Sequence, residues 1–232
     1  MRDIPPLARA YVTAVIALGV LVFWLALPPV FTEPGLFLVL LFAAVTGSTL
    51  KVRLPLPSGG LTLSVSFVAI FMGVLMLDRG AALLIAAASA WTQCTFRPQE
   101  NYPIYRAFFS MAAMVLAADL AGRTFVALTG GVIVPDAGLL LAVPIAGAVF
   151  FTVNSLVVSL AVSLATDLAF KRVWLDGLLW AATAYVLEAG AAAVMAILVV
   201  QNGLMLAPLL VAPFYLNYQA LRSRVAVMTA AA

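Results

Sequence analysis

Histidine is absent from the 232 residues, and cysteine occurs once, as Cys94. The missing histidine removes the commonest metal ligand and proton shuttle in proteins, and with it any histidine-ligated haem. A single cysteine excludes an intramolecular disulfide. We therefore expect neither a metal nor another cofactor.

Charged residues are also scarce, at 9% of the chain, whereas apolar residues make up 66% and the mean hydropathy is +1.18. A soluble domain carries about 25% charged and about 45–50% apolar residues, so this composition excludes a soluble domain of ordinary surface polarity. The net charge of +3 does not indicate a nucleic-acid partner, because such an excess is typical of membrane-protein loops that face anionic lipid. The composition predicts an all-α, polytopic transmembrane bundle in which residues 1–232 form one integral-membrane domain.

Apolar runs separated by short polar segments set the number of membrane spans. A helix that crosses the bilayer core needs about 20 residues, with a working range of about 17–25. On this rule we expect about eight spans, and six spans with two re-entrant segments is the alternative. The eight lie near residues 11–27, 35–50, 61–77, 81–96, 107–128, 139–166, 178–200 and 204–221.

The basic residues indicate the orientation of these spans. With eight spans both termini share one side, and that side collects most of the arginines and lysines, whereas Arg79 lies on the other side and Arg123 lies within a span. Cytoplasmic loops are enriched in Lys and Arg, so we expect a multi-pass membrane protein with both termini in the cytoplasm. The residues on the cytoplasmic side are Arg2, Arg9, Lys51, Arg53, Arg97, Arg106, Lys171, Arg172, Arg222 and Arg224.

Four polar residues inside predicted spans are the candidate site. Asp119 and Arg123 are four residues apart and can pair on one helix face, while Glu188 and Asn154 lie in two later spans. Ionisable groups in a bilayer core are costly and often functional, so one hypothesis is an interior polar cavity lined by all four residues. The alternative is structural: a self-neutralised Asp–Arg pair, a protonated Glu188, and an Asn154 that bonds between helices.

Small residues and prolines mark the remaining features of the spans. Small side chains three or four residues apart allow helices to approach closely in lipid, which indicates internal packing or a docking surface for a second protein. Prolines inside spans predict kinks. The small residues are Ala113, Ala117, Ala121, Ala189, Gly190 and Ala193, and the prolines are Pro144, Pro208 and Pro213.

Several short motifs resemble one family. KVRLP, LTLSVSF, TQCTFRP, PIYRAFFSMAAM, FFTVNSLVVSL, KRVW and APFYLNYQALRSR are similar to the MASE-type multi-spanning bacterial sensory domains, from about residue 50 to the end of the last span. In that family the domain precedes a cytoplasmic coiled coil and a GGDEF or HD-type output domain. The resemblance implies a cytoplasmic C-terminus and supplies no ligand-binding residues.

This chain departs from the family pattern at three places. Ser110 stands where relatives commonly have Asn, Glu188 stands at a usually apolar or glycine position, and the sequence ends at VAVMTAAA without a coiled coil or an output domain. We therefore expect an orphan sensory-type module.

Three functions are compatible with these observations. The first is a non-enzymatic accessory or structural subunit, which contacts another integral membrane protein laterally within a larger complex. The second is a small-molecule binding or transport component, similar to the substrate-binding subunit of an energy-coupling-factor transporter, whose ligand the sequence does not identify. The third is a lipid-directed enzyme that uses Asp119 or Glu188 as acid or base. No nucleophile stands beside a base and no metal cluster is evident, so we expect no enzyme.

Overall fold

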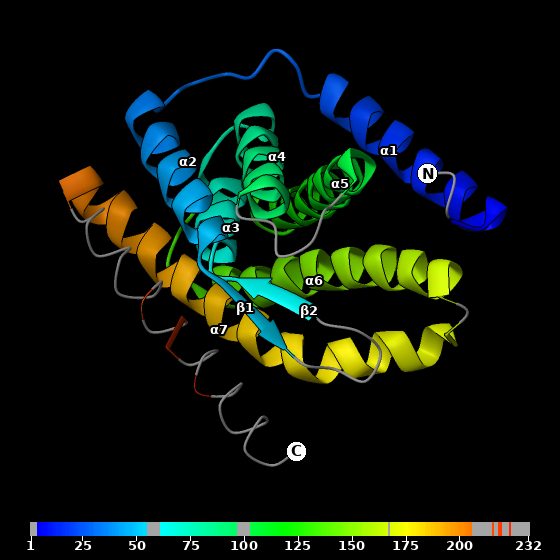
Figure 1. Ribbon diagram of the computed structural model, residues 1–232. Helices are drawn as coiled ribbons and strands as arrows, with labels where there is room; N and C mark the ends of the chain where they lie inside the picture. Colours follow the sequence, from blue (N-terminus) through cyan, green and yellow to red (C-terminus); the bar gives the residue numbers. More distant parts are fainter. Residues whose placement is uncertain are drawn as a thin grey trace.

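The computed structural model shows a bundle of helices with one short β-hairpin (Figure 1). It describes residues 4–54, 61–96, 103–166 and 168–205, together with positions 215, 218, 219 and 223. The elements in these ranges are α1 (Pro6–Trp24), α2 (Pro34–Thr49), β1 (Lys51–Leu54), β2 (Leu61–Ser64), α3 (Phe67–Met76), α4 (Arg79–Thr95), α5 (Ile104–Thr129), α6 (Ala137–Thr166) and α7 (Phe170–Asn202). Most of the predicted span at 204–221, with Pro208 and Pro213, lies outside the described residues.

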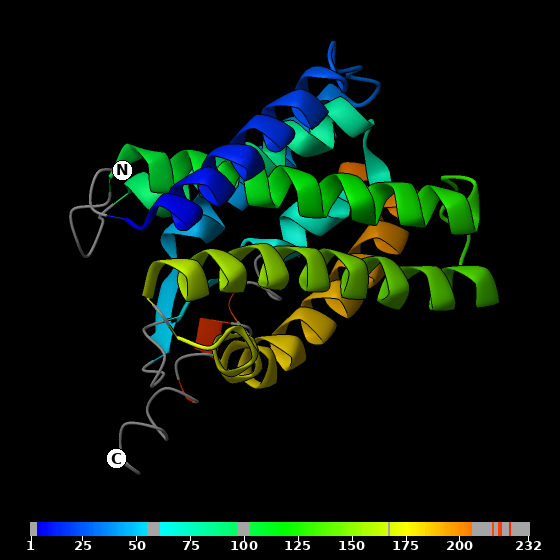
Figure 2. The same ribbon diagram turned by 90° about the vertical axis from the view of Figure 1, so that its right-hand side faces the viewer.

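The predicted helical bundle is confirmed. Within the described residues, four helical segments are long and apolar enough to cross a membrane: α1, α5, α6 and the segment Ala184–Met205, which includes the second half of α7. The helices α2 and α3 are apolar but shorter, with 16 and 10 residues. At 1.5 Å per residue the 33 residues of α7 extend about 50 Å, and Figure 2 shows this helix running obliquely to the paired α5 and α6.

The centre of the bundle is α3. Every residue from Phe67 to Leu75 is buried, and the helix packs against α2, α4, α5 and α7. A helix that is hydrophobic on all sides belongs inside a protein or a membrane. Ten residues give only about 15 Å of helix, so α3 is too short to cross the bilayer core and is instead enclosed by its longer neighbours.

The hairpin corrects the prediction of a helical span over 61–77. Residues 61–64 form β2, which pairs antiparallel with β1 so that Lys51 faces Ser64 and Leu54 faces Leu61. The cause is visible in LTLS, where apolar and hydroxyl residues alternate with the period of two that favours a strand. Strand pairing also satisfies backbone polar groups before the chain enters the apolar interior at α3.

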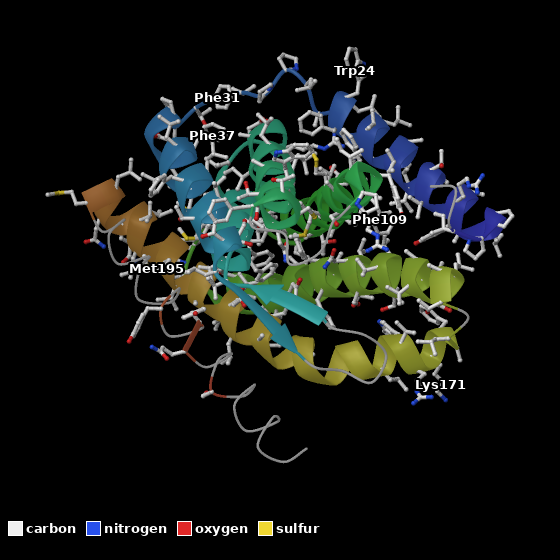
Figure 3. The ribbon with its side chains drawn as sticks, viewed as in Figure 1. Trp24, Phe31, Phe37, Phe109, Lys171 and Met195 are labelled. Carbon is white, nitrogen blue, oxygen red and sulfur yellow. The ribbon has the colours of Figure 1, made fainter. Side chains whose placement is uncertain are left out.

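Contacts between distant segments show which helix ends lie together. At one end of the bundle, the backbone N–H of Val30 donates to the Asp78 carboxylate at 3.1 Å. Towards the other end, Tyr11 in the first half of α1 donates to the Val157 carbonyl in the second half of α6. Trp24 and Lys171 lie at opposite sides of the bundle (Figure 3). These contacts agree with helices that run alternately up and down.

Hydrogen bonds and close approaches hold the outer helices to the bundle. Ser48 of α2 and Ser89 of α4 are both buried, and their hydroxyl oxygens lie 2.8 Å apart. On the other side, Gly19 of α1 rests against Ala112 of α5 so closely that an added Cβ would lie 2.5 Å from the Ala112 Cβ. Small residues of this kind let helix backbones approach in lipid.

We expect Gly19→Ala to destabilise the protein by about 1–3 kcal/mol, since the new methyl group overpacks the α1–α5 contact. Gly122→Ala in α5 is the matched control, because its Cβ would lie an ordinary 3.6 Å from Val74, and helix propensity favours alanine. Thermal melting of both variants in mild detergent checks this. Equal melting temperatures for the two variants would contradict the proposed helix contact.

Candidate functional site

A buried carboxylate with two arginines is the most strongly charged feature of the described residues. Asp119 of α5 is 6% exposed. Its Oδ1 accepts a hydrogen bond from Arg79 Nε, and its Oδ2 accepts from Arg123 Nε at 2.9 Å. Arg123 stands one turn further along the same helix, whereas Arg79 is the first residue of α4. We name these three residues the Asp119 cluster.

The residues on either side of Arg79 fix where α4 begins and so position the Arg79 side chain. Asp78 caps this helix, and its Oδ2 accepts from the backbone N–H groups of Gly80 and Ala81, as capping carboxylates do. Gly80 fits here because an added Cβ would lie 2.5 Å from the Ala26 carbonyl oxygen. The start of α4 is thereby held against the end of α1, and Arg79 Nη1 donates to the Leu25 carbonyl at 3.3 Å.

The three side chains of the Asp119 cluster differ in their exposure to solvent. Arg79 is 34% exposed and Arg123 60%, against 6% for Asp119. A desolvated carboxylate is costly unless it is paired and hydrogen-bonded, and here each oxygen has a guanidinium partner. The cluster therefore fixes three helices, α1, α4 and α5, around one carboxylate, with one more positive than negative charge.

A second polar group lies between α6 and α7. Asn154 Nδ2 donates to the Tyr185 hydroxyl at 3.4 Å, and Glu188, one turn after Tyr185, is 5% exposed. The Tyr185 ring contacts Phe67 and Phe151, with centroids 4.6 and 4.9 Å away. Aromatic side chains thus hold the tyrosine in place while its hydroxyl reaches the polar group.

The structure places the four predicted site residues in two groups. Asp119 and Arg123 meet at the contact between α4 and α5, whereas Asn154 and Glu188 lie on α6 and α7. The buried helix α3 packs against both α5 and α7. The predicted pairing of Asp119 with Arg123 is present, and a single ligand cavity shared by all four residues stays a prediction.

Sequence reasoning did not select two members of these groups. Arg79 had a signal, because it is the isolated basic residue on its predicted side of the membrane, yet its partner is 40 positions away. Tyr185 lies three residues before Glu188, a spacing that puts both on one helix face. Neither side chain belongs to a recognisable catalytic motif.

The arginines of the Asp119 cluster offer chemistry that suits anion binding. In the described part of the chain, no three His, Cys, Asp or Glu side chains gather as metal ligands would. Arginines recognise carboxylates and phosphates with their planar donor forks.

We expect Asp119→Asn to destabilise the protein by about 2–4 kcal/mol, because two guanidinium groups would then face each other without a carboxylate. The expected loss of stability lies between the cost of breaking an exposed ion pair and the cost of breaking a fully buried one. The control is Glu33→Gln, which removes an exposed negative charge that makes no side-chain capping bond and should change stability by less than about 0.5 kcal/mol. Melting in detergent measures both, and a similar loss in the two variants would refute the structural role.

Comparisons with known proteins yield one match, a family model. Neither the curated proteins nor the solved structures give a match to this chain. The model of the MASE9 family matches residues 13–219, which include the whole Asp119 cluster and the Asn154–Tyr185–Glu188 group. This confirms the resemblance to MASE-type domains, and together with the apolar helices it identifies a multi-pass membrane module of sensory type. The chain belongs to the MASE9 family.

Proposed function

We propose that this chain is a non-enzymatic sensory-type module of the bacterial cytoplasmic membrane, which acts by lateral contact with another integral membrane protein as an accessory subunit. Membership of the MASE9 family supports the sensory class. The observation that supports the proposed lateral contact is an exposed ridge of small and apolar residues on α7.

The α7 ridge consists of Val186, Leu187, Gly190 and Val194. Val186, Gly190 and Val194 are spaced four residues apart and so share one face of the helix. Val186 is 72% exposed and Val194 58%. Apart from the backbone of α7 itself, no atom of the described residues lies within 4 Å of a Cβ built on Gly190. A glycine between two exposed valines lets a partner helix come close, as small residues do in membrane interfaces.

The small-residue face of α5 serves a different purpose. Ala113, Ala117 and Ala121 are all at most 1% exposed, so this face is used for packing within the bundle. The corresponding face of α7 is divided, because Ala189 is buried and Gly190 is exposed. Of the two faces compared, the α7 face has a small residue, Gly190, that a second protein can reach.

The proposed orientation puts both termini in the cytoplasm. Lys171 and Arg172 at the start of α7 are exposed and suit the cytoplasmic interface, where basic residues are enriched. Trp24, at the other side of the bundle (Figure 3), suits the outer interface, where aromatic residues gather. The turn between α5 and α6, which contains the exposed Val132, would then face the outside.

Single cysteines in a Cys94→Ser background test this orientation. In intact spheroplasts, a membrane-impermeant maleimide should label Val132→Cys, whereas Lys171→Cys should react only after the membrane is opened. Both positions are exposed, so access to the reagent and not burial decides the result. Labelling of Lys171→Cys in intact spheroplasts would overturn the orientation.

Site-specific photo-crosslinking in native membranes tests the lateral contact. We expect a benzophenone side chain at Val186 or Val194 to give one defined adduct with another integral membrane protein, identified by mass spectrometry. The same probe at Leu18 or Leu21 of α1, which are 50% and 52% exposed, should give none. Gly190→Leu should remove the adduct while the protein still folds, because Gly190 is exposed and a Cβ there meets no described side chain within 4 Å.

Two results would contradict the proposal. Equal adducts from the α1 and α7 positions would show random collision in the membrane. An adduct of twice the mass of the chain would identify a second copy as the neighbour and not an accessory-subunit partner.

A further inference from the structure

The Asp119 cluster leaves hydrogen-bond donors that the described residues do not satisfy. Asp119 is bound through the Nε atoms of both arginines. No hydrogen bond within the described residues involves Nη1 or Nη2 of Arg123, whose side chain is 60% exposed. Arg79 Nη2 is buried and has no partner among them, which is unusual for a buried donor. Within the described residues, the unused donors are therefore both Nη groups of Arg123 and the Nη2 group of Arg79.

Asp119 orients Arg123 for contact with a further group. A carboxylate on Nε fixes the plane of the guanidinium and leaves its Nη1–Nη2 edge open, and that edge matches the two oxygens of a carboxylate or phosphate. Arg79 in turn holds the other oxygen of Asp119. The exposed arginine is therefore pre-oriented, and pre-orientation reduces the entropy lost on binding.

The local charge favours an anion. Arg79 is the first residue of α4, where the helix dipole already places partial positive charge. The neighbouring Asp78 offsets part of this charge, but its Oδ2 is occupied by the backbone N–H groups of Val30, Gly80 and Ala81. The two guanidinium groups and the two carboxylates cancel in formal charge, so the positive excess is the partial charge of the α4 N-terminus.

The depth of the cluster suits an interfacial ligand. Arg123 lies six residues before the end of α5 at Thr129, or about 9 Å along the helix axis. Its Nε bonds to Asp119, one turn earlier in α5. Arg79 of the same cluster begins α4 and donates to the Leu25 carbonyl just after the end of α1, so the cluster lies beside helix ends at this side of the bundle. Lipid phosphates and soluble anions from the adjoining aqueous side can both approach an exposed group there.

We propose that Arg123, held by Asp119 and supported by Arg79, forms a binding site for a phosphate or carboxylate group at this end of the bundle. The proposal goes beyond the lateral contact of α7, since it involves different helices. The ligand oxygens take the Nη edge of Arg123. Two sources have this chemistry: the phosphate of an anionic phospholipid and a small soluble phosphate or carboxylate.

Binding measurements on the full chain test the site with defined probes. In nanodiscs of neutral phosphatidylcholine, calorimetric titration with inorganic phosphate and with succinate measures soluble anions. Native mass spectrometry after mixing with equal amounts of phosphatidylglycerol and phosphatidylcholine measures lipid retention. Binding of phosphate or succinate in the calorimetric titration would identify a soluble anion as the ligand. Selective retention of phosphatidylglycerol in the mass spectrum would identify an anionic lipid.

The decisive variants are Arg123→Gln and Arg172→Gln. Each removes one positive charge from an exposed side chain, but Arg172 is near the start of α7, away from the cluster. We expect Arg123→Gln to weaken binding of the retained anion about tenfold or more, as for loss of a bidentate charged contact, and Arg172→Gln to leave it unchanged. Arg123→Lys should restore only part of the affinity, because it keeps the charge and loses the fork.

Three outcomes would overturn the proposal. The first is that neither soluble anion binds and phosphatidylglycerol is retained no better than phosphatidylcholine. The second is that Arg123→Gln and Arg172→Gln weaken binding equally, which would indicate nonspecific attraction to positive charge. The third is that Arg123→Gln leaves binding intact.

Discussion

Enclosure of α3 is the constraint on which the rest of the fold depends. The helix has no polar face and is too short to span the bilayer core, so it needs protein on every side. Four helices supply this cover, and several of the largest fully buried side chains, including Phe71, Ile70 and Met72, belong to α3 itself. In lipid the hydrophobic effect does not drive helices together, so close packing and interhelical hydrogen bonds provide the attraction. The contact of Gly19 with Ala112 is an example of close packing, and the Ser48–Ser89 bond is an example of an interhelical hydrogen bond.

The buried polar side chains of the described residues include several that lie where helices meet. Asp119 has a partner on each oxygen, and Asn154 donates to Tyr185. This arrangement follows from the cost of an unpaired charge in an apolar medium. The two polar groups also differ in their access to solvent. The Asp119 cluster has exposed arginine donors, whereas Glu188 is buried beside the Tyr185 ring.

The sequence was sufficient to predict the bundle, since 66% apolar residues leave no other fold class open. It also predicted the Asp119–Arg123 pair, because the pair is local and follows from helical spacing. It failed for Arg79, whose contact with Asp119 depends on how α4 packs on α5. It also failed at residues 61–64, where hydropathy alone merged a strand with the helix that follows. Local spacing is readable from one sequence, whereas contacts between distant segments depend on tertiary packing.

The carboxylate of Asp78 connects segments that are distant in the sequence. It accepts hydrogen bonds from the connection between α1 and α2 and also from the first turn of α4. The first turn of α4 bears Arg79, which holds α5 through Asp119. A continuous series of hydrogen bonds therefore runs from the α1–α2 connection through Asp78, the first turn of α4 and Arg79 to Asp119 on α5. Two carboxylates, those of Asp78 and Asp119, thus tie the α1–α2 connection and the helices α4 and α5 to one another.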